Sequence, residues 1–138
     1  MQINIDNRID KHITGFTNYV DFDSLLNKLP TTITELQING QVLNTLSIAQ
    51  FTQVFSKILP LLKTGSTLYV ESLDINVFCH AIACGSIALD EINRTLFDGK
   101  IKGVYNLIAL EHLLIQNGFE THAKGYEGLR FHLTMHRP

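Results

Sequence analysis

Short apolar strand patterns alternate with helical patterns along most of this chain. Four strand patterns, alternating or rich in β-branched and aromatic residues, lie at residues 2–5, 17–22, 34–39 and 66–72. Strands that are separated by helices pair in parallel, because a long crossover is needed to return to the same end of the sheet. We therefore expect an α/β fold with a mostly parallel sheet.

Four helical segments are predicted by N-cap residues and by apolar residues spaced three and four apart. They follow Ser47 and Asp74, cover residues 89–97, and follow Asn106. Pro60 lies late in the first of them and removes a backbone hydrogen bond, so we expect that helix to kink or end there.

Two alternating segments, residues 119–124 and 129–136, end the chain on either side of Gly125-Tyr126-Glu127-Gly128. This pattern predicts an antiparallel hairpin. The second segment has one apolar face, and its other face carries Arg130, His132, Thr134 and His136. A clean alternation indicates that one face of the sheet is thinly covered or solvated. We expect that face to support self-association as a homodimer, or contact with a protein partner.

The 138 residues fit one domain, residues 1–138, with a net charge of −2 and no basic cluster, so a nucleic-acid partner is not expected. The apolar runs are shorter than the roughly 20 residues of a membrane helix. The first residues lack a secretion signal, and we expect a cytoplasmic protein without a membrane partner. Cys79 and Cys84 lie in an apolar segment and are expected to be reduced and buried.

Three segments carry a resemblance to a known family. Ile3-Asn4-Ile5-Asp6-Asn7-Arg8 precedes a strand pattern that ends near Asp21, residues 59–70 contain Lys63 and Gly65 before another strand, and Gln116-Asn117-Gly118-Phe119 ends a helix. In this order they resemble small class I S-adenosylmethionine-dependent methyltransferases. Residues 34–46 are similar to the fourth strand of that family and the turn after it.

The resemblance implies a three-layer Rossmann-like fold whose seven strands are ordered 3-2-1-4-5-7-6, with the last strand antiparallel. The chain between Ile5 and Thr17 is too short for the usual first helix. Residues 31–34 leave little room for the usual third strand. We therefore expect a reduced version with six to seven strands and fewer helices.

The resemblance also places the cofactor crevice. A glycine-rich turn normally follows the first strand, because glycine allows positive φ and close approach of the backbone to the ligand. Here Asp6, Asn7 and Arg8 replace those glycines. Asp6 also sets a negative charge near the expected methionine carboxylate, which is unfavourable by about 1 to 4 kcal/mol. S-adenosylmethionine binding is thus expected to be lost.

Other residues match the expected cofactor site. Asp21 or Asp23 stands where a carboxylate would take the ribose hydroxyls, although an aspartate there also suits a turn in which it bonds the following backbone. Asn39 and Gly40 follow the next strand, beside the same crevice. No residue is singled out as catalytic, because the paired histidines of the family are replaced by Gln41 and Thr45.

Two main functions follow from this pattern. The first is a methyltransferase-like domain with an eroded cofactor loop, non-catalytic or weakly ligand-binding, that serves as an interaction or regulatory module. The alternative is an active small methyltransferase acting on a sugar or small-molecule hydroxyl, which the resemblance implies. A third option is a phosphate held by Arg8 with Asn7.

The six histidines do not predict a metal site. His80 and Cys84 are four residues apart on one helix, but such a pair is typical of a packed or half-exposed helix face. With a tight hairpin at Tyr126 and Glu127, His122 would pair with Phe131 and point away from His132. No metal is therefore expected.

Overall fold

The computed structural model describes residues 1–138, the side chain of Ile9 excepted. Its strands are β1 (Gln2–Ile5), β2 (Thr17–Tyr19), β3 (Ile33–Ile38), β4 (Leu62–Leu73), β5 (Glu120–Glu127) and β6 (Arg130–His136). Its α-helices are α1 (Phe22–Leu26), α2 (Ile48–Ile58), α3 (Ile75–Ala83), α4 (Leu89–Phe97) and α5 (Leu107–Gln116). Short 3₁₀ turns are η1 (Ile9–Lys11), η2 (Leu43–Thr45) and η3 (Leu59–Leu61).

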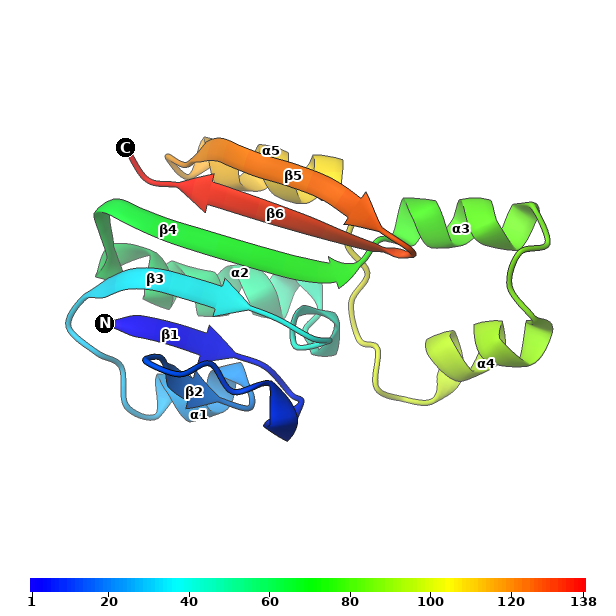
Figure 1. Ribbon diagram of the computed structural model, residues 1–138, viewed down its shortest axis with the longest axis horizontal. Helices are drawn as coiled ribbons and strands as arrows, with labels where there is room; N and C mark the ends of the chain where they lie inside the picture. The colour runs from blue at the N-terminus through cyan, green and yellow to red at the C-terminus, as the bar shows by residue number, and fades with distance from the viewer.

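The strands form one six-stranded sheet in the order β2-β1-β3-β4-β6-β5 (Figure 1). The strands from β1 to β4 pair in parallel, and β6 is antiparallel to both β4 and β5. This is the strand order that the methyltransferase resemblance implies, without its outermost strand. The expected mostly parallel sheet with a C-terminal antiparallel hairpin is confirmed.

The helices that cover the sheet, α1, α2 and α5, lie behind it in Figure 1. The connections through them, from β2 to β3, from β3 to β4 and from β4 to β5, all move the chain in the same direction across the sheet. Right-handed crossovers in one direction place their helices on one face. Among the connections between parallel strands, the one from β1 to β2 alone runs the other way, and it contains only η1. The expected third layer therefore has no helix among the described residues.

The two faces of the sheet differ accordingly. The face toward the helices is apolar and buried over the central strands, with Leu36, Val70 and Leu133 at its centre. We call the opposite face the open face, and its side chains come from alternate positions of the strands. They include Asn4, Glu35, Gln37, Thr67, Tyr69, Glu71, His132, Thr134, His136 and Ala123. The solvated face that the sequence of β6 predicted is present.

Local signals set the helix ends. Ser47 and Gln50 form a reciprocal capping box at the start of α2, and Pro60 lies in η3, directly after α2 ends at Ile58. The buried carboxylate of Asp74 caps α3 through Oδ1, which accepts from the backbone N of Asn76 and Val77. These three helix ends were predicted correctly.

The hairpin turn differs from the expected one. Glu127 pairs with Arg130, so the turn consists of Gly128 and Leu129, and strand β5 runs on through Gly125 and Tyr126. Phe131 therefore pairs with Tyr126. The expected pairing of His122 with Phe131 is wrong, because the turn lies two residues later in the sequence than expected, and His122 itself lies at a bulge in β5.

Helices α3 and α4 form an arm that projects beyond the carboxyl end of β4 (Figure 1). Only Phe78 of this arm is buried, and Phe97 is 77% exposed. Cys79 and Cys84 are both exposed, so the expectation of buried thiols is wrong: their helix is apolar, but it leaves the body of the fold. No helix in the described part of the chain has the length and apolarity needed to cross a membrane.

Candidate functional site

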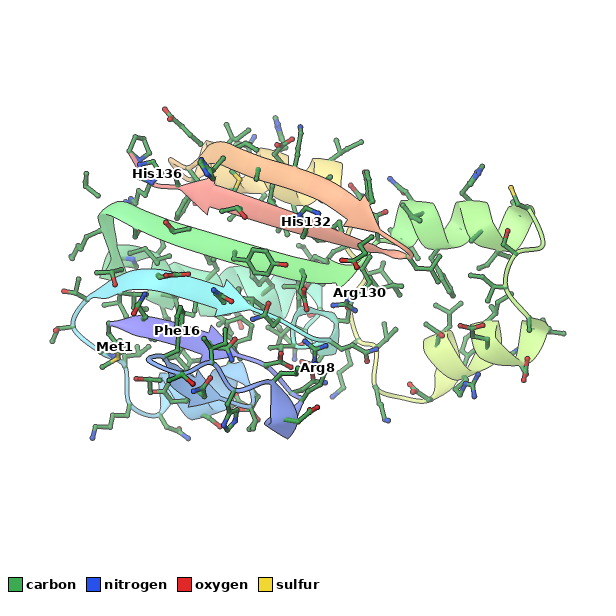
Figure 2. The ribbon with its side chains drawn as sticks, in the orientation of Figure 1. Met1, Arg8, Phe16, Arg130, His132 and His136 are labelled. Carbon is green, nitrogen blue, oxygen red and sulfur yellow. The ribbon has the colours of Figure 1, made fainter. Side chains whose placement is uncertain are left out.

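The carboxyl ends of β1 and β3 lie side by side in the sheet. From β1 the chain moves to one side of the sheet, and from β3 it moves to the other side. Open α/β sheets bind ligands in the crevice at such a switch point. Figure 2 shows Arg8 and Arg130 at this end of the sheet, far from Met1 and His136 at the other end.

The bend after β1 is held together by its own side chains. Asp6 is 2% exposed, and its Oδ1 accepts from the backbone N and the Nε of Arg8, both at 2.9 Å. Its Oδ2 accepts from Arg8 Nη2 at 2.8 Å. This hydrogen bonding to Asp6, together with nearby carboxylates, raises the pKa of Arg8 against the opposing effect of burial. The negative charge of Asp6 is thus compensated, which removes most of the expected repulsion toward an anionic ligand.

The loops after β1 and β3 touch at Gly40. Gly40 has a φ of +64°, and a Cβ built there would collide with Asn7 Oδ1 and would lie 2.7 Å from Asp6 Oδ1. Asn7 Oδ1 also accepts from the backbone N of Gln41 at 3.2 Å. No residue other than glycine has a positive φ in the described chain. The three residues that replace the family's glycines therefore adopt ordinary backbone angles and fill the space beside Gly40.

On the helical side of this contact lies a cavity of about 600 Å³. Asn7, Asp21 and Asp23 line it, together with apolar side chains of α1 and α2 and with Lys57 and Lys102. Asp21 Oδ1 caps α1 by accepting from Ser24 N at 2.8 Å and Ser24 Oγ at 2.6 Å. The structure therefore brings three of the predicted residues, Asn7, Asp21 and Asp23, to one cavity. Asp21 also bonds the backbone that follows it, as expected if this aspartate serves a turn.

Asn39 has a different position from the one expected. It is 8% exposed, and its Nδ2 donates to Asn4 Oδ1 at 2.7 Å and to Gln37 Oε1 at 3.2 Å. These bonds belong to a chain of amide and carboxylate groups along the open face. Asn39 lines none of the cavities described here.

On the other side of the contact between Asn7 and Gly40 lies a smaller recess of about 240 Å³. We call it the arginine recess, and its walls are Asn7, Arg8, Gly40, Gln41 and Arg130. Arg130 Nη2 donates to the carbonyl O of Gly40. No spacing or motif in the sequence predicts that Arg130 and Arg8 line the same recess. Its position at the start of a strand antiparallel to β4 places it at the carboxyl end of the parallel strands.

Glu71 connects the loop after β3 with the open face of the sheet. Its carboxylate accepts from Gly40 N at 2.9 Å and from the hydroxyl of Tyr69 at 3.1 Å. It also pairs with Arg8 at 3.3 Å and lies 3.7 Å from Arg130. Burial, and next the negative charge of Glu71, raise the pKa of Tyr69 to about 12. Tyr69 is therefore a neutral hydrogen-bond donor at neutral pH.

Helix α3 carries a histidine and a cysteine whose side chains are in contact. His80 Nε2 and Cys84 Sγ are 3.5 Å apart on the exposed side of α3. Among the residues that the structure describes, no group of three or more histidine, cysteine, aspartate or glutamate side chains could hold a metal ion.

The sheet order and the terminal hairpin define a Rossmann-like α/β fold, and solved structures match it. An O-methyltransferase family protein from Burkholderia thailandensis matches with a TM-score of 0.60 at 10% identity, over 88% of this chain and 36% of that protein. A protein from Pyrococcus horikoshii OT3 matches with a TM-score of 0.57 at 11% identity, over 99% of this chain and 73% of that protein. No family model and no curated protein matches the sequence.

At these identities the likeness concerns the fold alone, and it supports a methyltransferase-like fold for this chain. The chain spans little more than a third of the length of the Burkholderia protein.

Proposed function

We propose that this chain is a methyltransferase-like domain that does not hold S-adenosylmethionine and acts as an interaction or regulatory module. One observation carries this proposal: the side chains of Asp6 and Asn7 fill the space beside Gly40. A glycine loop at this position leaves that space to the ligand, because it has no Cβ atoms.

The geometry indicates what a cofactor would have to displace. A ligand whose ribose met Asp21 or Asp23 in the large cavity would reach the arginine recess only past Asn7, which lines both. Its passage would break the hydrogen bond from Gln41 N to Asn7 Oδ1. It would also press on Asp6, which is fixed by three donors of Arg8. Losing such bonds costs about 1 to 3 kcal/mol each, so tight binding is not expected.

Calorimetric titration with S-adenosylmethionine tests the proposal. We expect no heat of binding and no thermal shift up to about 1 mM, a concentration that detects interactions of about −4 kcal/mol. A dissociation constant in the micromolar range would refute it. The matched variants are Asp21→Asn in the large cavity and Asp90→Asn on the exposed helix α4.

A second function is favoured by one specific observation. Asn7, Asp21 and Asp23 converge on one cavity at the carboxyl ends of the strands, where the cofactor of an active enzyme would bind. An active methyltransferase acting on a sugar or small-molecule hydroxyl would bind S-adenosylmethionine there, and Asp21→Asn would then weaken that binding while Asp90→Asn would not. If the chain is the proposed module, the titration with S-adenosylmethionine shows no binding in the wild-type protein, in Asp21→Asn or in Asp90→Asn.

The open face is the surface that we propose for protein contact. It has no helix over it in Figure 1, and it carries both acidic and basic side chains, including Glu35, Glu71, His132 and His136. Self-association through this face predicts a dimer in multi-angle light scattering, and the reversal of Glu35 to Lys would weaken it. A strict monomer at high protein concentration would contradict the homodimer.

A further inference from the structure

The arginine recess differs from the other cavities in the chemistry of its walls. Arg8, Arg130, Asn7 and Gln41 contribute guanidinium and amide groups, Gly40 contributes backbone, and no carboxylate residue lines it. We propose that this recess binds the phosphate group of a small phosphorylated molecule. The inference rests on the proposed function, because it takes the crevice to be closed to S-adenosylmethionine.

Both guanidinium groups are oriented before any ligand arrives. Arg8 is held by the buried carboxylate of Asp6 through Nε and Nη2, and Arg130 is held by the carbonyl of Gly40 through Nη2. Among the described residues, Arg8 Nη1 and both Arg130 Nη1 and Nε make no hydrogen bond within the protein. A planar guanidinium presents its N–H groups in a fixed fork that matches a phosphate. The N–H groups that remain free on the two arginines of this recess suit a tetrahedral oxyanion.

The amide side chains complete the set of donors. Asn7 Oδ1 accepts a hydrogen bond from the backbone N of Gln41, so the oxygen of the Asn7 amide is already used within the protein. The Nδ2 group of Asn7 and the exposed side chain of Gln41 are then left for a ligand in the recess. Neutral amide donors beside two arginines add hydrogen bonds without further charge.

Nearby carboxylates limit the strength of binding. Asp6 balances the charge of Arg8, and Glu71 lies between the two arginines in a neighbouring cavity of about 410 Å³ that Glu127 also lines. The contacts of Glu71 are long, at 3.3 Å to Arg8 and 3.7 Å to Arg130. Removing its charge would therefore strengthen phosphate binding, whereas a purely structural role of Glu71 would not.

A third cavity receives the rest of the ligand. It has about 320 Å³, shares Gln41 and Arg130 with the arginine recess, and is bounded by Leu73, Phe78 and Leu129. Thr95 and Ile101, from α4 and the segment after it, also line this cavity. Asn44 and Glu127 are further polar residues of its lining. A small apolar group attached to the phosphate suits the apolar walls, so phenyl phosphate should bind more tightly than inorganic phosphate.

Titration with inorganic phosphate and phenyl phosphate at low salt, followed by calorimetry and by amide NMR shifts, tests the inference. We expect saturable binding with a dissociation constant of about 1 mM for phosphate, with the largest shifts at Gly40 and Gln41. Arg130→Ala should weaken binding about tenfold or more, since charge-assisted hydrogen bonds are the stronger kind. Arg94→Ala, which removes the same charge from the exposed surface of α4, should leave it unchanged. Glu71→Gln should tighten binding severalfold.

The results separate this inference from the proposed function. No saturation with either phosphate, or equal losses in Arg130→Ala and Arg94→Ala, would overturn the inference and leave the module proposal standing. Amide NMR shifts confined to residues outside the arginine recess would also overturn the inference, and this test needs only the wild-type protein. Micromolar S-adenosylmethionine binding together with saturable phosphate binding at Gly40 would overturn the proposed function alone.

Discussion

Replacing Gly40 with alanine tests whether the loops after β1 and β3 are held as tightly as the structure indicates. Three costs follow from the geometry. A non-glycine residue at a φ of +64° costs about 1 kcal/mol. The new Cβ displaces Asn7 Oδ1 from the backbone N of Gln41, which costs about 1 kcal/mol for the lost hydrogen bond. It also presses on Asp6 Oδ1, 2.7 Å away, at a further cost of about 1 kcal/mol.

The free energy of unfolding should therefore fall by about 3 kcal/mol, measured by urea denaturation with a two-state fit. Gly15→Ala is the matched control, because Gly15 has a φ of +88° and its Cβ would meet no atom within 4 Å. That control should lose only about 1 kcal/mol. Equal losses in both variants would refute the close contact, and adding Asn7→Ala to Gly40→Ala should recover part of the loss.

Three other substitutions give further checks. Asp74→Ala should lower the free energy of unfolding by about 3 kcal/mol in urea, because the buried carboxylate accepts from the N-terminus of α3 and from the backbone N of Leu107; a loss below about 1 kcal/mol would contradict this. Ser66→Ala should be neutral or stabilise by up to about 1 kcal/mol, since Ser66 Oγ is buried and has no hydrogen-bond partner among the described residues. Tyr69 is expected to lose its proton only near pH 12. Because its folded pKa lies above the unfolded value of about 10, its contribution to stability is full below pH 10 and is lost as the pH rises toward 12. Tyr69→Phe should reduce the amplitude of the late step in the absorbance titration of tyrosinate, which Tyr105 shares because burial raises its pKa to about 12 as well, and an unchanged titration would contradict the assignment.

Features governed by neighbours in sequence could be predicted. The capping residue Ser47, the end of α2 before Pro60 and the start of α3 at Asp74 all depend on groups within a few residues. The alternation of strands and helices and the terminal hairpin predicted a mostly parallel sheet with an antiparallel end, whereas the order of its strands came from the resemblance to the methyltransferase family.

The hairpin turn was misplaced because two glycines compete for it. Gly128 has a φ of +60° and makes the turn, while Gly125 lies in the strand for a different reason: a Cβ there would lie 2.9 Å from Nε2 of His132. A rule based on local sequence assigns both glycines to the turn, because it takes no account of the His132 ring across the strand pair.

The candidate site was predicted only in part. Asn7, Asp21 and Asp23 do meet at one cavity, but Asn39 faces another polar network and the contact between Asn7 and Gly40 was not foreseen. Arg130 reaches the site from the far end of the sequence, and no spacing rule links it to Arg8. The arm of α3 and α4 likewise exposes its cysteines because of its place in the fold.

The connection from β1 to β2 is the single link that would carry a helix over the open face. Lengthening it would leave every strand partner unchanged, because the parallel register of β1 with β2 is set by Ile3 with Thr17 and Ile5 with Tyr19. Inserting a designed amphipathic helix into this link is thus a direct engineering route to a protein whose sheet is covered by helices on both faces. The same position is the natural place to insert a reporter or an affinity tag without disturbing the hydrophobic core.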